Sequence, residues 1–203
     1  AACPRGFVGA ILPHKFKNKH AKVMACTTTT LPALAFDDCT PQIHFGQIGK
    51  LYLTRNTSAD VLVDASDDAE WTTRIDNDAV IPGSGAAPIR ELTVIGSLPK
   101  PTTTETKISG GRKVNSTPEN TLTFVVDETN LANMAAARTY QTAGTVTQKC
   151  WFLAGGLLFG GDSGFEAQIT LYYTIPESET DVQKLEGTLT WTAVQPEVMA
   201  SPF

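Results

Sequence analysis

The chain has 203 residues, of which 41% are hydrophobic and 18% charged, and its formal net charge is −5. This length suits one domain with a buried core, alone or with an extended arm, and the composition is that of a globular chain rather than a disordered one. The acidic balance argues against a protein that grips nucleic acid through its phosphates. No apolar run reaches the roughly 18 to 20 residues that a membrane-spanning helix needs.

Threonine fills much of the polar share that charged residues usually occupy. Its β-branched side chain loses rotamer freedom in a helix but fits a pleated, half-wet surface. The composition therefore favours β structure before any pattern is considered.

Residues 1–45 differ from the rest and predict an irregular N-terminal arm. They hold all three histidines and a basic stretch that begins at Lys15, Phe16 and Lys17, and prolines interrupt any period. We expect this arm to dock on another subunit through that stretch. The start of the chain does not have the pattern of a signal peptide, and Ala1 fits removal of an initiator methionine, which predicts a cytosolic product.

The four cysteines form no C-x-x-C pair and match no common zinc spacing. Cys26 and Cys39 could pair in an oxidising setting, but small buried thiols are the simpler interpretation. His14 and His20 with Cys26 lack a fourth ligand at a recognised spacing. We therefore predict no metal site and no cofactor.

Residues 46–203 predict one β-rich domain. Short apolar or alternating runs predict strands in its first half, at Lys50–Thr54, Asp60–Asp64, Glu70–Asp76 and Arg90–Ile95. Within the third run, Trp71, Thr73 and Ile75 share one side. Ile81–Pro88 is a loop because it is rich in proline and glycine.

A polar hairpin follows, with strands over Thr102–Ser109 and Arg112–Asn115 joined by Gly110 and Gly111. A Gly-Gly pair suits the positive φ angles of tight hairpin turns. Because the flanks have no core face, we expect the hairpin to reach away from its own domain and contact a partner subunit. The predicted contact residues are Lys107, Ile108, Ser109, Gly110, Gly111, Arg112 and Lys113.

Thr121–Val126 is strand-like, and the chain then enters one helix over Leu131–Tyr140 that ends at Gly144. Asp127 or Thr129 is the expected N-cap. A single face of the helix is expected to carry Leu131, Met134, Ala135 and Arg138.

The C-terminal third predicts three strands and a turn. Lys149–Leu153 is short and apolar, and Gly155–Gly164 is a glycine-rich turn. Two strict alternations follow, with dry faces at Ala167, Ile169, Leu171, Tyr173 and Ile175 and then at Leu185, Gly187, Leu189, Trp191 and Ala193. This period of two indicates an antiparallel sheet over a core. With the hairpin counted separately, about eight strands and one flanking α-helix predict a mainly β chain, an antiparallel β-sandwich or barrel with a long protruding hairpin.

The sequence offers little catalytic chemistry. Gly161–Gly164 repeats the tetrapeptide that surrounds the nucleophile of trypsin-like proteases, but the family's Ala-Ala-His-Cys motif is missing and Phe165 replaces the expected glycine. The acidic cluster Asp60, Asp64, Asp67, Asp68 and Glu70 lacks the spacing of an EF-hand. We predict a turn, a solvated loop and no enzyme.

From about Gly46 to Ala193 the chain resembles the tail tube (major tail) proteins of long-tailed bacteriophages. The resemblance lies in the Ile108–Arg112 hairpin tip, the strand-to-helix run Phe124–Tyr140, the two segments Trp151–Gly156 and Gly160–Ala167, and Leu185–Trp191. It implies a virion protein, made in the host cytoplasm, whose copies form rings, usually hexameric. These rings would stack into a tube for DNA ejection, with the hairpin and terminal arms locking them. The implied partners are the protein itself, other tail proteins and, transiently, DNA, but no membrane.

Two other classes stay open. Head decoration and head–tail connector proteins of virions are also β-rich, acidic and free of chemistry. A carbohydrate- or ligand-binding β-sandwich is suggested by Trp71, Trp151 and Trp191, although Trp191 lies on the dry side of its predicted strand and core packing explains it better.

Overall fold

The computed structural model describes residues 46–56, 61–77, 88–143 and 146–203. The predicted arm with Lys15, Phe16 and Lys17, the three histidines, and Cys26 with Cys39 lie outside the described residues. The helices and strands are β1 (Ile48–Arg55), α1 (Asp68–Arg74), β2 (Arg90–Ser97), β3 (Glu105–Lys107), β4 (Lys113–Asn115), β5 (Glu119–Val126), α2 (Leu131–Ala143), β6 (Gln148–Ala154), β7 (Leu157–Phe159), β8 (Phe165–Thr174), β9 (Lys184–Thr192) and β10 (Val198–Ala200). The mainly β prediction is confirmed.

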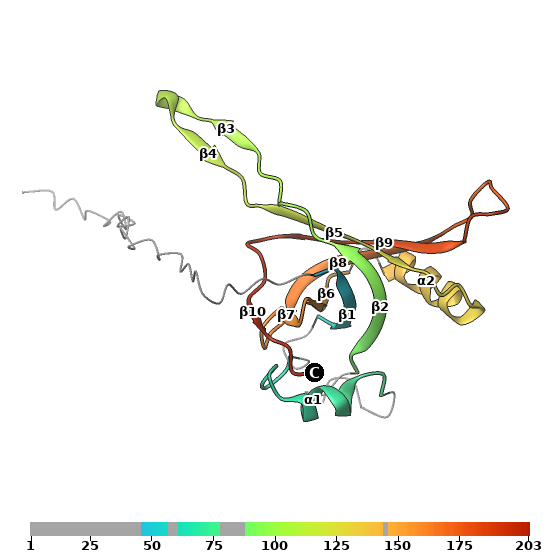
Figure 1. Cartoon of the computed structure of the whole chain (residues 1–203). Helices are drawn as coiled ribbons and strands as arrows, with labels where there is room; N and C mark the ends of the chain where they lie inside the picture. Colours follow the sequence, from blue (N-terminus) through green and yellow to red (C-terminus); the bar gives the residue numbers. More distant parts are fainter. Residues whose placement is uncertain (1–45, 57–60, 78–87, 144–145) are drawn as a thin grey trace, which may run out of the picture. The chain divides into compact units, whose positions relative to one another are not determined.

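Six strands close into a barrel. Their order is β1-β2-β5-β9-β8-β6, and β6 pairs with β1 to complete the circle. Every pairing between these strands is antiparallel. β7 and β10 extend the sheet outward from β6, while β3 and β4 form a separate two-stranded ribbon (Figure 1). Closure removes free edges from the six central strands, and exposed edges are where sheets aggregate.

The interior of the barrel is one apolar core. Alternate residues of the strands point inward, as the period of two predicts, and the helix α2 packs against β8. Fully or nearly fully buried side chains include Leu51, Leu122, Phe124, Phe152, Ile169, Leu171, Leu185, Leu189 and Trp191. The predicted dry face of β9 is confirmed up to Trp191. On β8 it ends at Leu171, because Tyr173 and Ile175 are exposed beyond the core.

A second apolar cluster lies outside the barrel, between α1 and the outer faces of β1 and β6. Tyr52, Trp71 and Trp151 are its large members, and each is fully buried. The rings of Trp71 and Trp151 meet edge to face with centroids 5.6 Å apart, a favoured aromatic geometry. β1 and β6 are therefore buried on both faces, which explains their continuous apolar runs.

Two of the predicted strands are absent. Residues 70–74 belong to helix α1 instead, because Asp67 caps its start by accepting a hydrogen bond from the Ala69 N–H. Trp71 and Arg74, three residues apart, occupy its buried face, so the apparent alternation was misleading. In the described part of the second run, residues 61–64, no strand forms and Val63 is exposed.

The helix α2 is where it was predicted, but its cap and its buried face differ. Asn130 is the N-cap, because its side-chain oxygen accepts the Asn133 N–H at 2.8 Å. Ala137 is fully buried and Tyr140 packs against the core, whereas Leu131, Ala135 and Arg138 are exposed. The expected face was therefore wrong apart from the half-buried Met134. Gly144 lies outside the described residues.

The hairpin turn and the glycine-rich turn also differ in detail. β3 and β4 are joined by a three-residue turn, Ser109–Gly111, closed by a hydrogen bond from the Ile108 N–H to the Arg112 carbonyl. Gly110 and Gly111 both have positive φ, as expected. The segment 155–164, expected to be only a turn, contains the short strand β7 paired with β6. Its glycines allow that hairpin to be compact.

Candidate assembly surfaces

Among the described residues, no helix or strand covers the outer face of β2, β5, β9 and β8, in contrast to that of β1 and β6. Its central side chains form rows across the four strands. Ile95, Ser97, Thr121, Thr123, Val125, Gln168, Thr170, Tyr172, Glu186, Thr188 and Thr190 make up this surface, which we call the hydroxyl face. Most of these residues carry a hydroxyl, and Glu186 is the only charged member.

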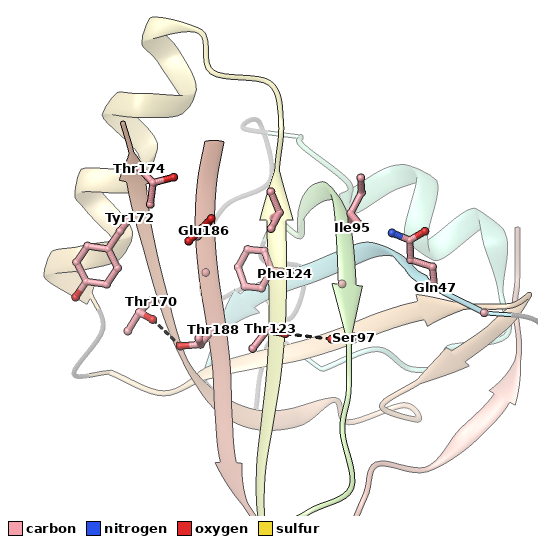
Figure 2. A pocket seen from close by; sticks show the side chains of 14 residues that line it. Gln47, Ile95, Ser97, Thr123, Phe124, Thr170, Tyr172, Thr174, Glu186 and Thr188 are labelled. Atoms are coloured by element: carbon pink, nitrogen blue, oxygen red, sulfur yellow. Dashed lines mark hydrogen bonds between the residues drawn. The ribbon is translucent and has the colours of Figure 1, made fainter. Parts of the chain in front are cut away.

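Two hydroxyl pairs organise one row of this face. The Ser97 and Thr123 hydroxyls are 3.1 Å apart, and those of Thr170 and Thr188 are 2.7 Å apart (Figure 2). The register places Thr123 opposite Thr188, so the row runs across four strands. Because the two hydroxyls of each pair hydrogen bond to one another, their orientation is fixed and their remaining hydrogen-bonding capacity faces solvent.

A hollow of about 810 Å³ lies on this face, between the Ser97 row and the row of Ile95 and Tyr172. Its floor depends on Gly187. A Cβ at Gly187 would lie 2.3 Å from the Phe124 ring and 2.7 Å from the Thr170 carbonyl oxygen. Only glycine therefore lets the Phe124 ring pack across β9 inside the barrel, which keeps these strands close together.

The β3–β4 hairpin carries the contact residues predicted from sequence. Residues 102–117 are all exposed, including the hydrophobic Ile108 and Val114. Lys113 forms an ion pair with Glu105 at 2.8 Å, whereas the register places it directly opposite Lys107. The seven predicted tip residues thus lie together on an exposed hairpin, and their contact with a partner subunit stays a prediction.

The Gly161–Gly164 segment has structural contacts. The Gly161 carbonyl accepts the Trp151 indole N–H at 2.7 Å, and a Cβ at Gly164 would collide with the Trp151 ring. Asp162 accepts the Ala65 N–H through its carboxylate at 2.8 Å. The segment therefore joins the second apolar cluster to the loop before α1.

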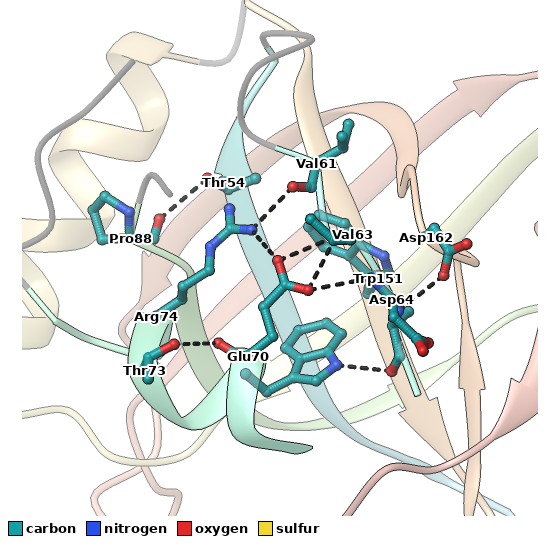
Figure 3. Close-up of polar contacts among 12 residues, drawn as sticks. Thr54, Val61, Val63, Asp64, Glu70, Thr73, Arg74, Pro88, Trp151 and Asp162 are labelled. Atoms are coloured by element: carbon teal, nitrogen blue, oxygen red, sulfur yellow. Dashed lines mark hydrogen bonds and ion pairs between the residues drawn. The ribbon is translucent and has the colours of Figure 1, made fainter. Parts of the chain in front are cut away.

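The described acidic residues of the 60–70 cluster bind backbone and side-chain donors (Figure 3). The Glu70 carboxylate accepts the Val63 N–H and pairs at 3.2 Å with Arg74, whose guanidinium also donates to the Val61 carbonyl. The Ser66 hydroxyl and N–H donate to Asp64 and lower the pKa of that carboxyl. Asp60 lies outside the described residues.

The three tryptophans and Cys150 lie in the two apolar clusters. All three tryptophans are buried, which removes the reason for a carbohydrate platform. Cys150 is a free, fully buried thiol, and burial raises its pKa.

Within the described ranges, no group of three or more His, Cys, Asp or Glu residues could hold a metal ion. Nor does any helix of the described part have the length and apolarity to cross a membrane.

Sequence reasoning missed the hydroxyl face as a site. The alternating threonines of β8 and β9 were visible, but their alignment with Ser97 and Thr123 depends on strand register and on the order β2-β5-β9-β8. Comparison with protein-family models, curated proteins and solved structures finds no match for this chain.

Proposed function

We propose that this protein is a structural subunit of a phage tail, whose copies assemble into stacked rings and form the tube through which DNA is ejected. The observation that carries the proposal is the hydroxyl face: a broad, ordered sheet surface that no other described element of the chain covers, beside an exposed hairpin. A wall built from many copies requires a sheet with one face packed on the core of its own copy and the other face open, and the sheet of β2, β5, β9 and β8 has this arrangement.

The chemistry of this face supports passage rather than binding of DNA. Proteins hold the DNA backbone mainly through lysine and arginine, and neither occurs in the central rows of the hydroxyl face. Lys184, opposite Thr174, lies at the end of β9 beyond these rows. Threonine hydroxyls are neutral and well hydrated, and Glu186 adds repulsion. A bore lined with these residues would let a polyanion move without being trapped.

Assembly into rings also fits the fold. The six central strands close into a barrel, and a contact between two different surfaces of such a subunit generates a ring or a filament depending on its rotation. The family resemblance implies six copies in each ring. Assembly would take place in the host cytoplasm, with other tail proteins at the ends of the tube.

Negative-stain electron microscopy of the purified protein across a concentration series tests this proposal. We expect hollow rings or tubes of uniform bore. Single copies at every concentration would contradict it, and single copies that bind only to preformed phage heads would favour a head decoration protein instead.

A further inference from the structure

A second protruding segment of the chain is acidic. The loop between β8 and β9 carries Glu177, Glu179 and Asp181 and no lysine or arginine over residues 175–183. These carboxylates are exposed, and so are Ile175 and Val182 beside them. We call residues 175–183 the acidic loop.

The β3–β4 hairpin has the opposite charge. Over residues 102–117, Lys107, Arg112 and Lys113 outnumber the single acid Glu105. Like charges placed directly opposite each other destabilise a hairpin, and Lys107 lies opposite Lys113. A two-stranded ribbon without a buried face is also only marginally stable alone. The hairpin therefore has features that an acidic partner with apolar contacts would stabilise.

The two segments lie at opposite ends of the same sheet. β4 leads into β5 at Glu119, which pairs with Thr192 at one end of β9, whereas the acidic loop joins Thr174 to Lys184 at the other end. The length of β9 puts these ends roughly 27 Å apart at about 3.4 Å a residue. Figure 1 shows the two projections leaving the sheet at different ends.

We infer that the basic β3–β4 hairpin of one copy docks on the acidic loop of the next copy, and that this head-to-tail contact stacks one ring on another. The inference rests on the proposed function, because it supplies the axial contact that a tube of rings needs. Opposite charges at opposite ends favour repetition in one direction, while like ends repel each other. Ile108 and Val114 would meet Ile175 and Val182 when the charges are paired.

A charge swap tests this contact. K107E/R112E reverses the hairpin but keeps the Lys113–Glu105 ion pair, and E177K/E179K reverses the acidic loop. The chain that combines all four changes has the net charge of −5 of the natural sequence, because the two reversals cancel. Circular dichroism melting checks that each variant folds, and sedimentation velocity measures the concentration at which assembly begins.

We expect each single reversal to raise that concentration at least tenfold and the combined chain to return to within about threefold of the natural protein. A higher salt concentration should weaken the assembly of the natural protein and of the combined chain, because the charge pairs between the hairpin and the acidic loop are exposed to solvent. No change in either reversal, no recovery in the combined chain, or no self-association of the natural protein would each overturn the inference.

The same data separate this inference from the proposed function. Hollow tubes that form equally well from all variants would leave the tube proposal intact and refute the hairpin contact. Solid filaments that respond to the charge swap would support the contact and refute the tube.

Discussion

One outer face of the barrel is covered by other parts of the chain, and the other is open. Over β1 and β6, helix α1 and the segment around Gly161 bury tryptophans against the sheet, and the indole N–H groups of Trp71 and Trp151 donate to backbone carbonyls of the same chain. Glu70 and Arg74 form an ion pair beside them (Figure 3). Over β2, β5, β9 and β8, the same kind of strand presents hydroxyls to solvent (Figure 2). The first face contributes to folding of the single copy, and we infer that the second contributes to what copies do together.

The largest effect is expected from a comparison of two variants, one from each face. Trp151→Ala removes a fully buried ring and its hydrogen bond to Gly161, so we expect a loss of about 4 kcal/mol in the free energy of unfolding. Thr123→Val on the hydroxyl face should change it by less than about 0.5 kcal/mol. Urea unfolding below the assembly concentration measures both, and equal losses would show that the two faces do not differ as described.

The polar network under α1 should also be costly to break. Glu70→Ala leaves the buried Arg74 guanidinium without its carboxylate, and we expect a loss of about 3 kcal/mol. The double variant E70L/R74M removes both charges, and its free energy of unfolding should fall by less than that of Glu70→Ala alone. If the single variant is the more stable of the two, the ion pair has no such role.

A smaller loss is expected at the floor of the hollow. Gly187→Ala forces the Phe124 ring or the Thr170 backbone to move and should cost about 2 kcal/mol. Gly49→Ala is the matched control, because a Cβ there meets nothing within 4 Å. Both variants melting at the temperature of the natural protein would mean that the barrel adjusts at β9 without cost.

The smallest effect concerns pH. The pKa of Asp64 is lowered in the folded chain by Ser66, so its contribution to stability is complete above the ordinary carboxyl pKa of about 4 and is lost as the pH falls through the folded value. Thermal melts from pH 6 to pH 2.5 should therefore show a slightly shallower acid loss for Asp64→Asn. A steeper loss in the variant would contradict the assigned direction.

Much of the fold is visible in the sequence because β8 and β9 alternate strictly and the apolar runs of β1 and β6 are short and uninterrupted. The region before β2 was mistaken, since Trp71 and Ile75 fit both a period of two and a helical turn, and the Asp67 cap decides between them only when the loop is in place. The short strand β7 was missed because three residues between glycines carry no period.

The candidate sites were also only partly predictable from the sequence. The basic residues of the hairpin tip can be found in the sequence, as can the acids at 177, 179 and 181. That Lys107 faces Lys113, and that the two charged segments lie at opposite ends of one sheet, follows only from strand register and order. The hydroxyl rows likewise need four strands, distant in sequence, to lie side by side.

We propose that the hydroxyl face of the barrel lines a bore. Cryo-electron microscopy of the assembled natural protein tests it most directly, because a helical reconstruction at side-chain resolution locates β5, β8 and β9 in each copy. We expect a hollow tube with Thr123, Thr170, Glu186 and Thr188 facing the lumen. A tube with these residues on its outer surface, or an assembly without a channel, would contradict it.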